Sequence, residues 1–366
     1  GTDVIALRRA LVPIVLSAVL ACSASAIDRG QAPSSFATQV ASLSERDGYF
    51  DTDNLISNES SYQQILPELQ KRKVHGGAYV GVGPDQNFTY IAETQPAIAF
   101  IIDVRRDNLL LHLLFKALFE LSRTRVEYLA QLLGRPVPSE IESWRTAPID
   151  RLVAYVDRAA ATSADVAALR ARVDAAIKRS GLPLSPQDLA TLDRFHRRFI
   201  EEGLSLRFQS TGRPPRSYYP SYRQLLSDSD ASGRQGNYLA SEDAFQFVKG
   251  LQARDQIIPV VGDVSGPTAM AAIGRLLTAR QIPLSAFYVS NVEFYLFGEG
   301  AFSRYVANLG RLPHTENAVI IRSVFGGFAG GFRPGDASVS RVQSMDELLT
   351  GVAAGRIQYY ADLVRH

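Results

Sequence analysis

Cysteine is nearly absent from the 366-residue chain, and Cys22 alone cannot form an internal disulfide. The five histidines are scattered without metal-ligand spacing, so the sequence predicts no metal site. The net charge is only +2 at pH 7, which gives no electrostatic case for nucleic-acid binding. With 46% hydrophobic residues, the chain can form one large domain or two small ones with a sizeable core.

Long hydrophobic runs are also lacking. The apolar run at residues 10–21 is too short for a membrane-spanning helix. It follows Arg8-Arg9 and precedes small residues, which is typical of a secretory signal over residues 1–26. Two processing routes are open: a lipobox that leaves a lipidated Cys22, or cleavage after Ala26. We expect export to the periplasm or a lipoprotein anchor, with membrane contact only through the signal or Cys22. A non-functional signal would leave the protein cytoplasmic.

The clearest motif lies between residues 74 and 108. The apolar run 78–83 predicts a buried strand, and a turn, a helix-length segment and a second apolar run at 97–104 follow it. This order predicts a βαβ nucleotide site, in which glycines admit the ligand and an acid on the second strand accepts hydrogen bonds from ribose hydroxyls. The ligand-binding residues predicted here are Gly81, Gly83, Pro84, Asp85 and Asp103.

A structural interpretation of the same motif stays open. The third glycine of the dinucleotide pattern is missing, because Gln86 occupies its position. The segment could then be an ordinary tight turn, with Asp103 capping the helix that starts near Asp107.

Composition divides the chain into three parts. Residues 27–73 are predicted as a linker and helical segment, and residues 74–366 as an α/β domain with a helical insertion at about 134–203. Two loop-like stretches, 46–62 and 207–240, are either parts of a substrate pocket or solvated and stiff connectors. The substrate-loop candidates within them are Asp51, Asp53, Asn54, Tyr218 and Tyr219.

Strand and helix patterns alternate again after Ser241. Strands are predicted at 256–263, 284–289 and 318–324, with helices between them, and a glycine-rich loop at 325–336 lacks the lysine of a phosphate-binding loop. This alternation predicts a doubly wound, mainly parallel sheet. Polar groups at four strand ends should then converge on one edge. They are Gly83-Pro84-Asp85, Asp103, Asp263, and Ser290-Asn291 with Glu293.

This pattern resembles the Rossmann-like fold of class I S-adenosylmethionine-dependent methyltransferases. More closely, the chain resembles an uncharacterised bacterial family with that fold, first known from a Leptospira hypothetical protein. The phrases that carry the closer resemblance are GYFDTDNLISNESSY, GGAYVGVGPDQNF, RRDNLLLHLLFKALF, GRQGNYLASEDAFQFV, IPVVGD and SAFYVSNVEFYL. The resemblance implies S-adenosylmethionine as cofactor, with the methionine part at residues 80–84, ribose at Asp103 and adenine by Asp263. It also implies that Asn291 and Glu293 orient or deprotonate a methyl acceptor.

The sequence also departs from that pattern. No acid precedes the glycine turn, and the fourth strand end lacks an Asn-Pro-Pro-Tyr signature. Three functions therefore stay open: a methyltransferase, a non-catalytic exported protein that binds a small molecule or envelope partner, and a dinucleotide-dependent oxidoreductase. The signal-like N-terminus favours the second, because S-adenosylmethionine is a cytoplasmic metabolite, and the missing third glycine disfavours the third.

Overall fold

The computed structural model describes residues 35–214 and 216–365. The predicted signal at 1–26, Cys22 and the start of the predicted linker lie outside the described residues. None of the helices in the described ranges is long and apolar enough to cross a membrane.

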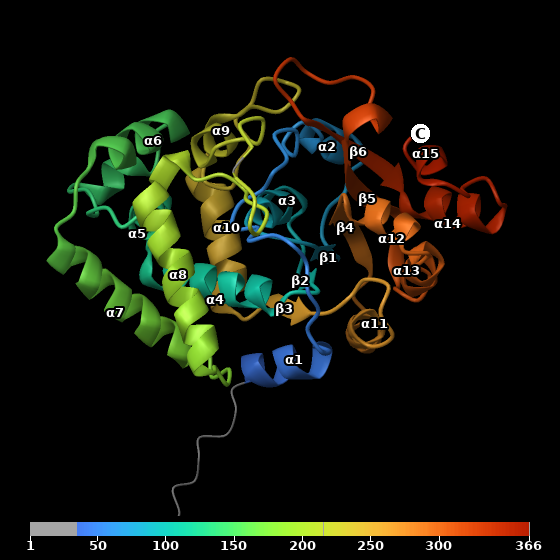
Figure 1. Ribbon diagram of the computed structural model, residues 1–366, viewed down its shortest axis with the longest axis horizontal. Coiled ribbons are helices and arrows are strands. Elements are labelled where there is room, and N and C mark those ends of the chain that lie inside the picture. Colours follow the sequence, from blue (N-terminus) through green and yellow to red (C-terminus); the bar gives the residue numbers. More distant parts are fainter. Residues whose placement is uncertain (1–34, 215, 366) are drawn as a thin grey trace, which may run out of the picture. The chain divides into compact units, whose positions relative to one another are not determined.

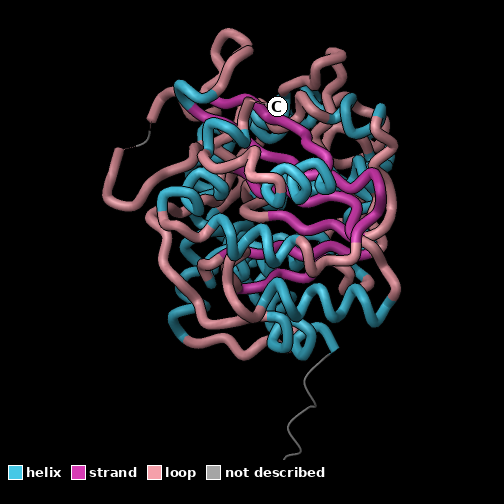
Figure 2. The backbone as a smooth tube through the Cα atoms, turned by 90° about the vertical axis from the view of Figure 1, so that its right-hand side faces the viewer, coloured by secondary structure: helices cyan, strands magenta, loops and turns pink. Residues whose placement is uncertain are grey.

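Six strands form one sheet in the order β3-β2-β1-β4-β5-β6, and Figure 2 shows them side by side between helices. Strands β1 to β5 run parallel, and β6 pairs antiparallel with β5. The predicted α/β fold with a mainly parallel, doubly wound sheet is confirmed. The strands are β1 (Ala78–Gly81), β2 (Ile98–Asp103), β3 (Ile257–Val261), β4 (Leu284–Ser290), β5 (His314–Phe325) and β6 (Ser338–Ser344).

Helices cover both faces of the sheet (Figure 1). Helices α3, α4 and α10 pack on one face, and α1, α11, α13 and α14 pack on the other. The α-helices are α1 (Ser35–Leu43), α2 (Leu66–Lys71), α3 (Gln86–Thr94), α4 (Arg106–Leu121), α5 (Arg125–Leu132), α6 (Ile149–Arg158), α7 (Ser163–Arg179), α8 (Pro186–Glu202), α9 (Tyr222–Ser227), α10 (Glu242–Ala253), α11 (Ala269–Arg280), α12 (Val292–Gly298), α13 (Phe302–Leu309), α14 (Met345–Ala353) and α15 (Tyr360–Leu363). Three short 3-10 helices are η1 (Ile141–Trp144), η2 (Gly203–Ser205) and η3 (Gly326–Phe328).

Strands β1, β2 and β3 are buried along almost their whole length. Every residue of β1 and β3 is buried, and so are the first five residues of β2. Parallel strands covered on both faces need apolar side chains on both sides, which explains the continuous apolar runs in the sequence. The strands predicted within 78–83, 97–104 and 256–263 are therefore confirmed.

The apolar stretch from residue 108 to 133 forms two helices and not one. Helix α4 ends at Leu121, and α5 begins after Thr124. The side chain of Thr124 accepts a hydrogen bond from the Glu127 backbone, and Glu127 bonds back to the Thr124 backbone. This capping box starts a new helix inside the apolar stripe.

The predicted insertion at 134–203 contains η1, α6, α7 and α8. Helices α7 and α8 pack against α4. Helix α8 begins with Ser185 as N-cap and Pro186 in the first turn. The segment therefore lies beyond α4, outside the layer of helices that contacts the sheet.

Candidate functional site

A cavity of about 1220 Å³ lies at the carboxyl ends of the parallel strands. Gly83 after β1, Asp103 at the end of β2, Asp263 after β3, and Ser290 and Asn291 at the end of β4 all line it. Strands β1 and β4 are neighbours where the strand order reverses, the place at which doubly wound sheets bind ligands. The structure thus brings together polar residues from four strand ends.

The turn after β1 places Gly83 in the cavity wall. Gly83 has φ +83°, a left-handed conformation that glycine adopts without strain. Its carbonyl oxygen lies 2.8 Å from Nε2 of the buried His112. Burial lowers the pKa of His112 to about 4, so the ring is neutral and its Nε2–H donates to Gly83. His112 therefore fixes the orientation of this turn, a role that no local sequence signal marks.

Gly81 is needed for packing and does not line the cavity. A Cβ atom at this position would lie 1.9 Å from Oδ1 of Asn87 and 2.7 Å from the ring of Tyr79. The Tyr79 hydroxyl donates to the same Oδ1 at 2.8 Å. Glycine at this strand end makes room for a buried hydrogen bond.

Asp85 and Pro84 also lie outside the cavity lining. The Asp85 carboxylate is buried and accepts hydrogen bonds from the hydroxyls of Tyr222 at 3.2 Å and Tyr238 at 3.3 Å. Burial raises the pKa of Asp85 to about 6, although both hydroxyls favour the charged form. The acid at the start of α3 thus bonds to residues behind the turn instead of facing the cavity.

Asp103 lines the cavity, and its carboxylate is bound by Arg105. Arg105 Nη2 donates to Oδ2 at 2.7 Å, while Nε and the backbone N–H donate to Oδ1 at 3.0 and 2.9 Å. Arg105 Nη1 donates to the carbonyl oxygens of Thr52 and Asp53, at 3.3 and 3.4 Å. Asp103 thus bonds to the backbone of Arg105, the N-cap residue of α4, and it also lines the cavity.

Asp263 lines the cavity on the β3 side. Its Oδ1 accepts hydrogen bonds from the backbone and hydroxyl of Ser265, at 2.7 and 2.9 Å. Next to it, Glu45 accepts bonds from backbone N–H groups at the start of α11, including Ala269 at 3.1 Å. Burial would raise the pKa of Glu45, but these bonds outweigh it and lower the pKa. An acid therefore occupies the N-terminus of α11.

Ser290 and Asn291 face the cavity where β4 ends, and Glu293 does not. Glu293 is 1% exposed, and it forms a buried ion pair with Arg322, whose Nε donates to Oε2 at 2.6 Å. The Tyr305 hydroxyl donates to Oε1 at 3.2 Å. The structure thus gives Glu293 the partners of a core residue, and it places only Asn291 of this pair where an acceptor could bind.

The two loop-like stretches, 46–62 and 207–240, meet over the cavity. Thr52 pairs with Ser210 in an isolated antiparallel bridge, and Asp51 forms an ion pair with Arg213. Asp53 forms an ion pair with Arg198 of α8 and does not line the cavity. The substrate-loop candidates that line the cavity are Asp51, Asn54, Tyr218 and Tyr219.

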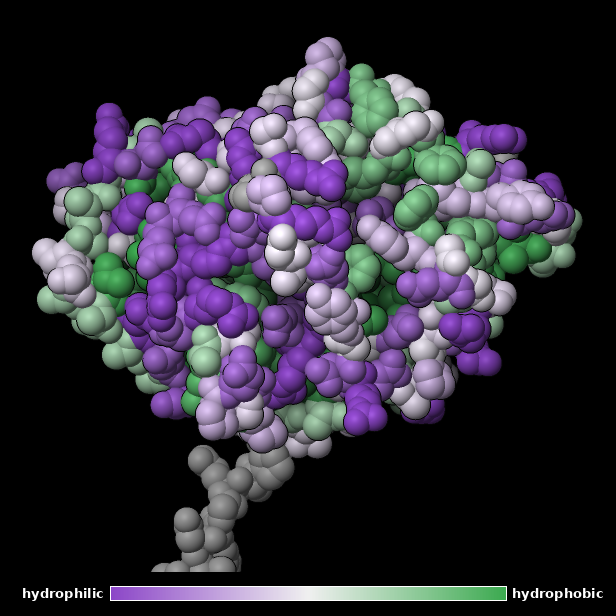
Figure 3. Space-filling model, viewed as in Figure 1, coloured by the Kyte–Doolittle hydropathy of each residue, from purple (hydrophilic) through white to green (hydrophobic). Residues whose placement is uncertain are grey.

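An aromatic rim surrounds the opening of the cavity, and the sequence interpretation missed most of it. Six of the ten exposed large hydrophobic side chains in the described ranges line the cavity. The patch at the upper right of Figure 3 lies over the C-terminal elements, from which part of this rim comes. The sequence signal for this rim is the high frequency of aromatic residues after β4 and within the glycine-rich loop. The rim consists of Tyr49, Phe50, Tyr218, Phe294, Tyr295 and Phe328.

Neither a metal site nor a curated relative identifies the chemistry. No group of three or more His, Cys, Asp or Glu residues in the described part of the chain could hold a metal ion. Comparison with curated proteins finds no match. The family described as "Domain of unknown function (DUF7790)" matches residues 54–137 and 196–346. The unmatched segment between these ranges contains η1, α6, α7 and the first part of α8. Since the two ranges cover more than half of the chain, the protein belongs to this family, whose description states no activity.

Proposed function

We propose that the chain is an S-adenosylmethionine-dependent methyltransferase that acts on a small-molecule acceptor. The observation that carries this proposal is the cavity at the carboxyl ends of β1 to β4. A small-molecule site usually has a volume of roughly 300–1,000 Å³. At about 1220 Å³, this cavity has room for a cofactor and an acceptor side by side.

The residues of the cavity fit this cofactor. Gln86 lines the cavity with a buried Oε1 atom that has no hydrogen-bond partner among the described residues, and an ammonium group could donate to it. Oδ2 of Asp103 accepts a single hydrogen bond, so it keeps a lone pair for a ribose hydroxyl. Asp263 would lie by the base. When bound, the cofactor supplies an electrophilic methyl group on a sulfonium.

The charges around the cavity favour this cofactor over a dinucleotide. A pyrophosphate binds to the unoccupied N-terminus of a helix, where backbone N–H groups face it. Here Glu45 accepts hydrogen bonds from backbone N–H groups at the start of α11, while Asp85 adds a buried carboxylate at the start of α3 without capping that helix. S-adenosylmethionine carries no phosphate, so these two acids do not oppose its binding.

The aromatic rim indicates the class of acceptor. Aromatic side chains recognise flat apolar groups by stacking and edge contacts. Phe294 contacts Phe328 at 6.1 Å and Tyr295 at 5.5 Å between ring centroids, so these rings already form one surface. We therefore infer an apolar or aromatic acceptor. Methyl transfer then depends mainly on holding acceptor and cofactor in line while the loops exclude water.

A non-catalytic binding protein is the second candidate. It is favoured by the carboxylates of Asp103 and Glu293, since each is already bound by an arginine. The same cavity would then hold an apolar ligand without chemistry, in keeping with the predicted export signal.

Ligand stabilisation of the purified chain separates the two functions. At a concentration about 100 times its dissociation constant, S-adenosylhomocysteine should add about 2.7 kcal/mol to the free energy of unfolding. This gain would appear as a higher melting temperature, and Asp263→Asn should reduce it. A folded chain that shows no shift at millimolar S-adenosylhomocysteine would contradict the methyltransferase and leave the binding protein.

A further inference from the structure

Ser290 adopts a strained conformation at the centre of the cavity wall. Its φ of +54° is left-handed, a strained conformation for a non-glycine residue and one that clusters at active sites. The residue lines the cavity at the end of β4, and its hydroxyl donates a hydrogen bond to Oε1 of Glu59. A cavity-facing hydroxyl is thereby joined to an acid behind it.

Glu59 is buried without the kind of partner that buried acids usually have. It is 1% exposed, and its Oε1 also accepts a hydrogen bond from the Tyr288 hydroxyl at 2.8 Å. Its other oxygen, Oε2, is buried and accepts no hydrogen bond of ordinary geometry in the described part of the chain, although the buried Ser323 hydroxyl helps to lower the pKa of Glu59. The buried Glu293, by contrast, is held by Arg322. A buried carboxylate without a cationic partner destabilises a fold, so packing alone does not explain Glu59.

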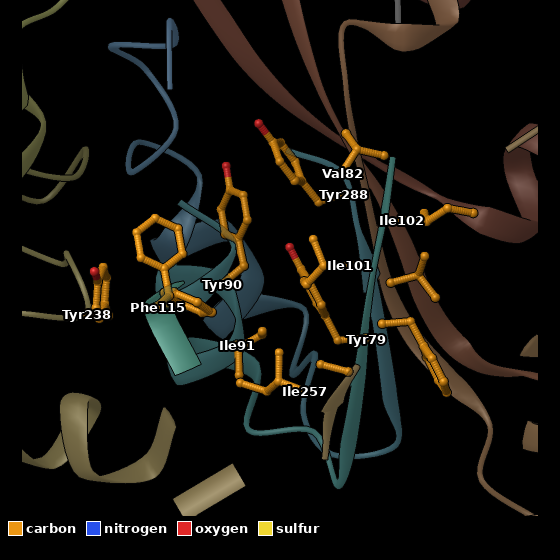
Figure 4. Packing of buried hydrophobic residues seen from close by; sticks show 14 of the residues in the cluster. Tyr79, Val82, Tyr90, Ile91, Ile101, Ile102, Phe115, Tyr238, Ile257 and Tyr288 are labelled. Atoms are coloured by element: carbon orange, nitrogen blue, oxygen red, sulfur yellow. The ribbon is translucent and has the colours of Figure 1, made fainter. Parts of the chain in front are cut away.

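Three tyrosines surround this acid: Tyr79 of β1, Tyr90 of α3 and Tyr288 of β4. Figure 4 shows their hydroxyls pointing to the same side, the upper side of the view. Burial raises the pKa of each tyrosine well above its usual range, so all three stay protonated near neutral pH. Burial also raises the pKa of Glu59 to about 6, although the hydroxyls favour its charged form. Glu59 is thus the member of this cluster that exchanges a proton near neutral pH.

We propose that Ser290 and Glu59 act as a proton-accepting pair for a protic acceptor, a hydroxyl or an amine, bound in the cavity. This inference rests on the methyltransferase function proposed above. Ser290 touches the acceptor, and Glu59 acts through Ser290 as a positioning residue and final proton acceptor. Burial holds the pKa of Glu59 near neutral pH, as general-base catalysis favours.

A lone pair of the acceptor oxygen or nitrogen forms the bond to the methyl carbon. The carbon–sulfur bond breaks, and its electron pair stays on the sulfur, which loses its positive charge. The acceptor's proton passes to Ser290 Oγ, while the proton of Ser290 passes to Oε1 of Glu59. The carboxylate ends as a neutral acid and later returns its proton to solvent.

The pair itself is tested without cofactor or acceptor. Carboxyl signals of the full chain are followed by ¹³C NMR from pH 4 to 9, and Glu59→Gln identifies the signal of Glu59. We expect a midpoint near pH 6 that rises in Ser290→Ala, because a hydrogen bond to the charged form is lost. Ser42→Ala, at an exposed serine outside the cavity, should leave it unchanged. An unchanged midpoint in Ser290→Ala would overturn the pair.

The role of Ser290 and Glu59 in methyl transfer is tested with four protic probes: phenol, catechol, aniline and imidazole. In Ser290→Ala, the kcat measured by release of S-adenosylhomocysteine should be at least 100-fold lower. The affinity for S-adenosylmethionine should be unchanged. Glu59→Gln should remove the rise in rate between pH 5 and 7. Cofactor binding without methylation of any probe would overturn the protic acceptor. Absence of cofactor binding would instead overturn the proposed function, and the NMR titration alone would then decide whether the pair exists.

Discussion

Asp103 and Arg105 form a clamp between the end of β2 and the loop at residues 46–62. Arg105 binds both carboxylate oxygens of Asp103 and reaches the carbonyl oxygens of Thr52 and Asp53. One acid therefore both lines the cavity and holds the loop that covers it. Loss of either residue should change ligand binding, but for different reasons.

Asp103→Asn and Arg105→Gln distinguish direct ligand binding from loop clamping. If Asp103 accepts a ribose hydroxyl, its loss removes a charged hydrogen bond worth about 1.5–3 kcal/mol, which is roughly 10- to 100-fold in affinity. Arg105→Gln keeps the carboxylate and should cost less. Calorimetric affinities for S-adenosylhomocysteine check this order. An equal or larger loss in Arg105→Gln would mean that Asp103 acts only through the clamp.

Glu293→Gln should destabilise the fold by about 3–5 kcal/mol, because it leaves Arg322 buried without a counter-charge. Replacing both residues, with Glu293→Leu and Arg322→Met, should cost much less. Urea unfolding measures both. Glu68→Gln is the control, since its ion pair with Arg72 is more than a third exposed and should contribute less than about 1 kcal/mol. Near-normal stability of Glu293→Gln would show that this pair does not hold the core.

The stability of the protein should depend on Glu59 in a defined pH window. Burial raises the pKa of Glu59 from 4.5 to about 6, so the folded state holds the proton more tightly than the unfolded state. Stability is therefore lost as pH rises from about 4.5 through 6, by about 2 kcal/mol. Glu59→Gln lacks this loss and should gain stability relative to the wild type as pH increases.

Urea unfolding at several pH values tests this expectation. The raised pKa of Asp85 acts in the same direction in both proteins, so it cancels in the comparison. If the difference in free energy of unfolding between Glu59→Gln and wild type stays constant from pH 4 to 8, the raised pKa of Glu59 is contradicted.

Phe294→Ala should weaken binding of an aromatic ligand without affecting the cofactor. Phe294 is part of the aromatic rim, and loss of its ring should cost about 1.5 kcal/mol, or roughly tenfold in affinity. Fluorescence titration with 2-naphthol measures this loss. Phe332→Ala is the matched control, since Phe332 is similarly exposed but lies outside the cavity lining. Equal losses in both variants would indicate non-specific binding.

The sheet could be predicted from sequence because buried parallel strands need continuous apolar runs. Residues 78–83 and 97–104 are such runs, and both form central strands. Strand β6 could not be predicted this way, since it is an edge strand in which buried and partly exposed residues mix. The convergence of strand ends follows from parallel order alone, so Asp103 and Asp263 lie in one cavity as expected.

The direction that each acid faces could not be predicted, because it depends on distant partners. Asp85 bonds to Tyr222 and Tyr238, which are 137 and 153 residues away. Glu59 belongs to a loop that the sequence marked as polar, but its partner Tyr288 lies 229 residues further along the chain. No local pattern contains such pairs, so burial and charge pairing emerge only in the folded structure.

The most direct test of the central claim is calorimetric titration of the purified chain with S-adenosylmethionine and S-adenosylhomocysteine, with NADH and ATP as controls. We predict micromolar binding of S-adenosylhomocysteine, and weaker or no binding of the two phosphate-bearing controls. Asp103→Ala should lose S-adenosylhomocysteine binding while its fold stays intact. A folded chain that binds neither sulfur ligand, or that binds NADH more tightly than either, would contradict the central claim.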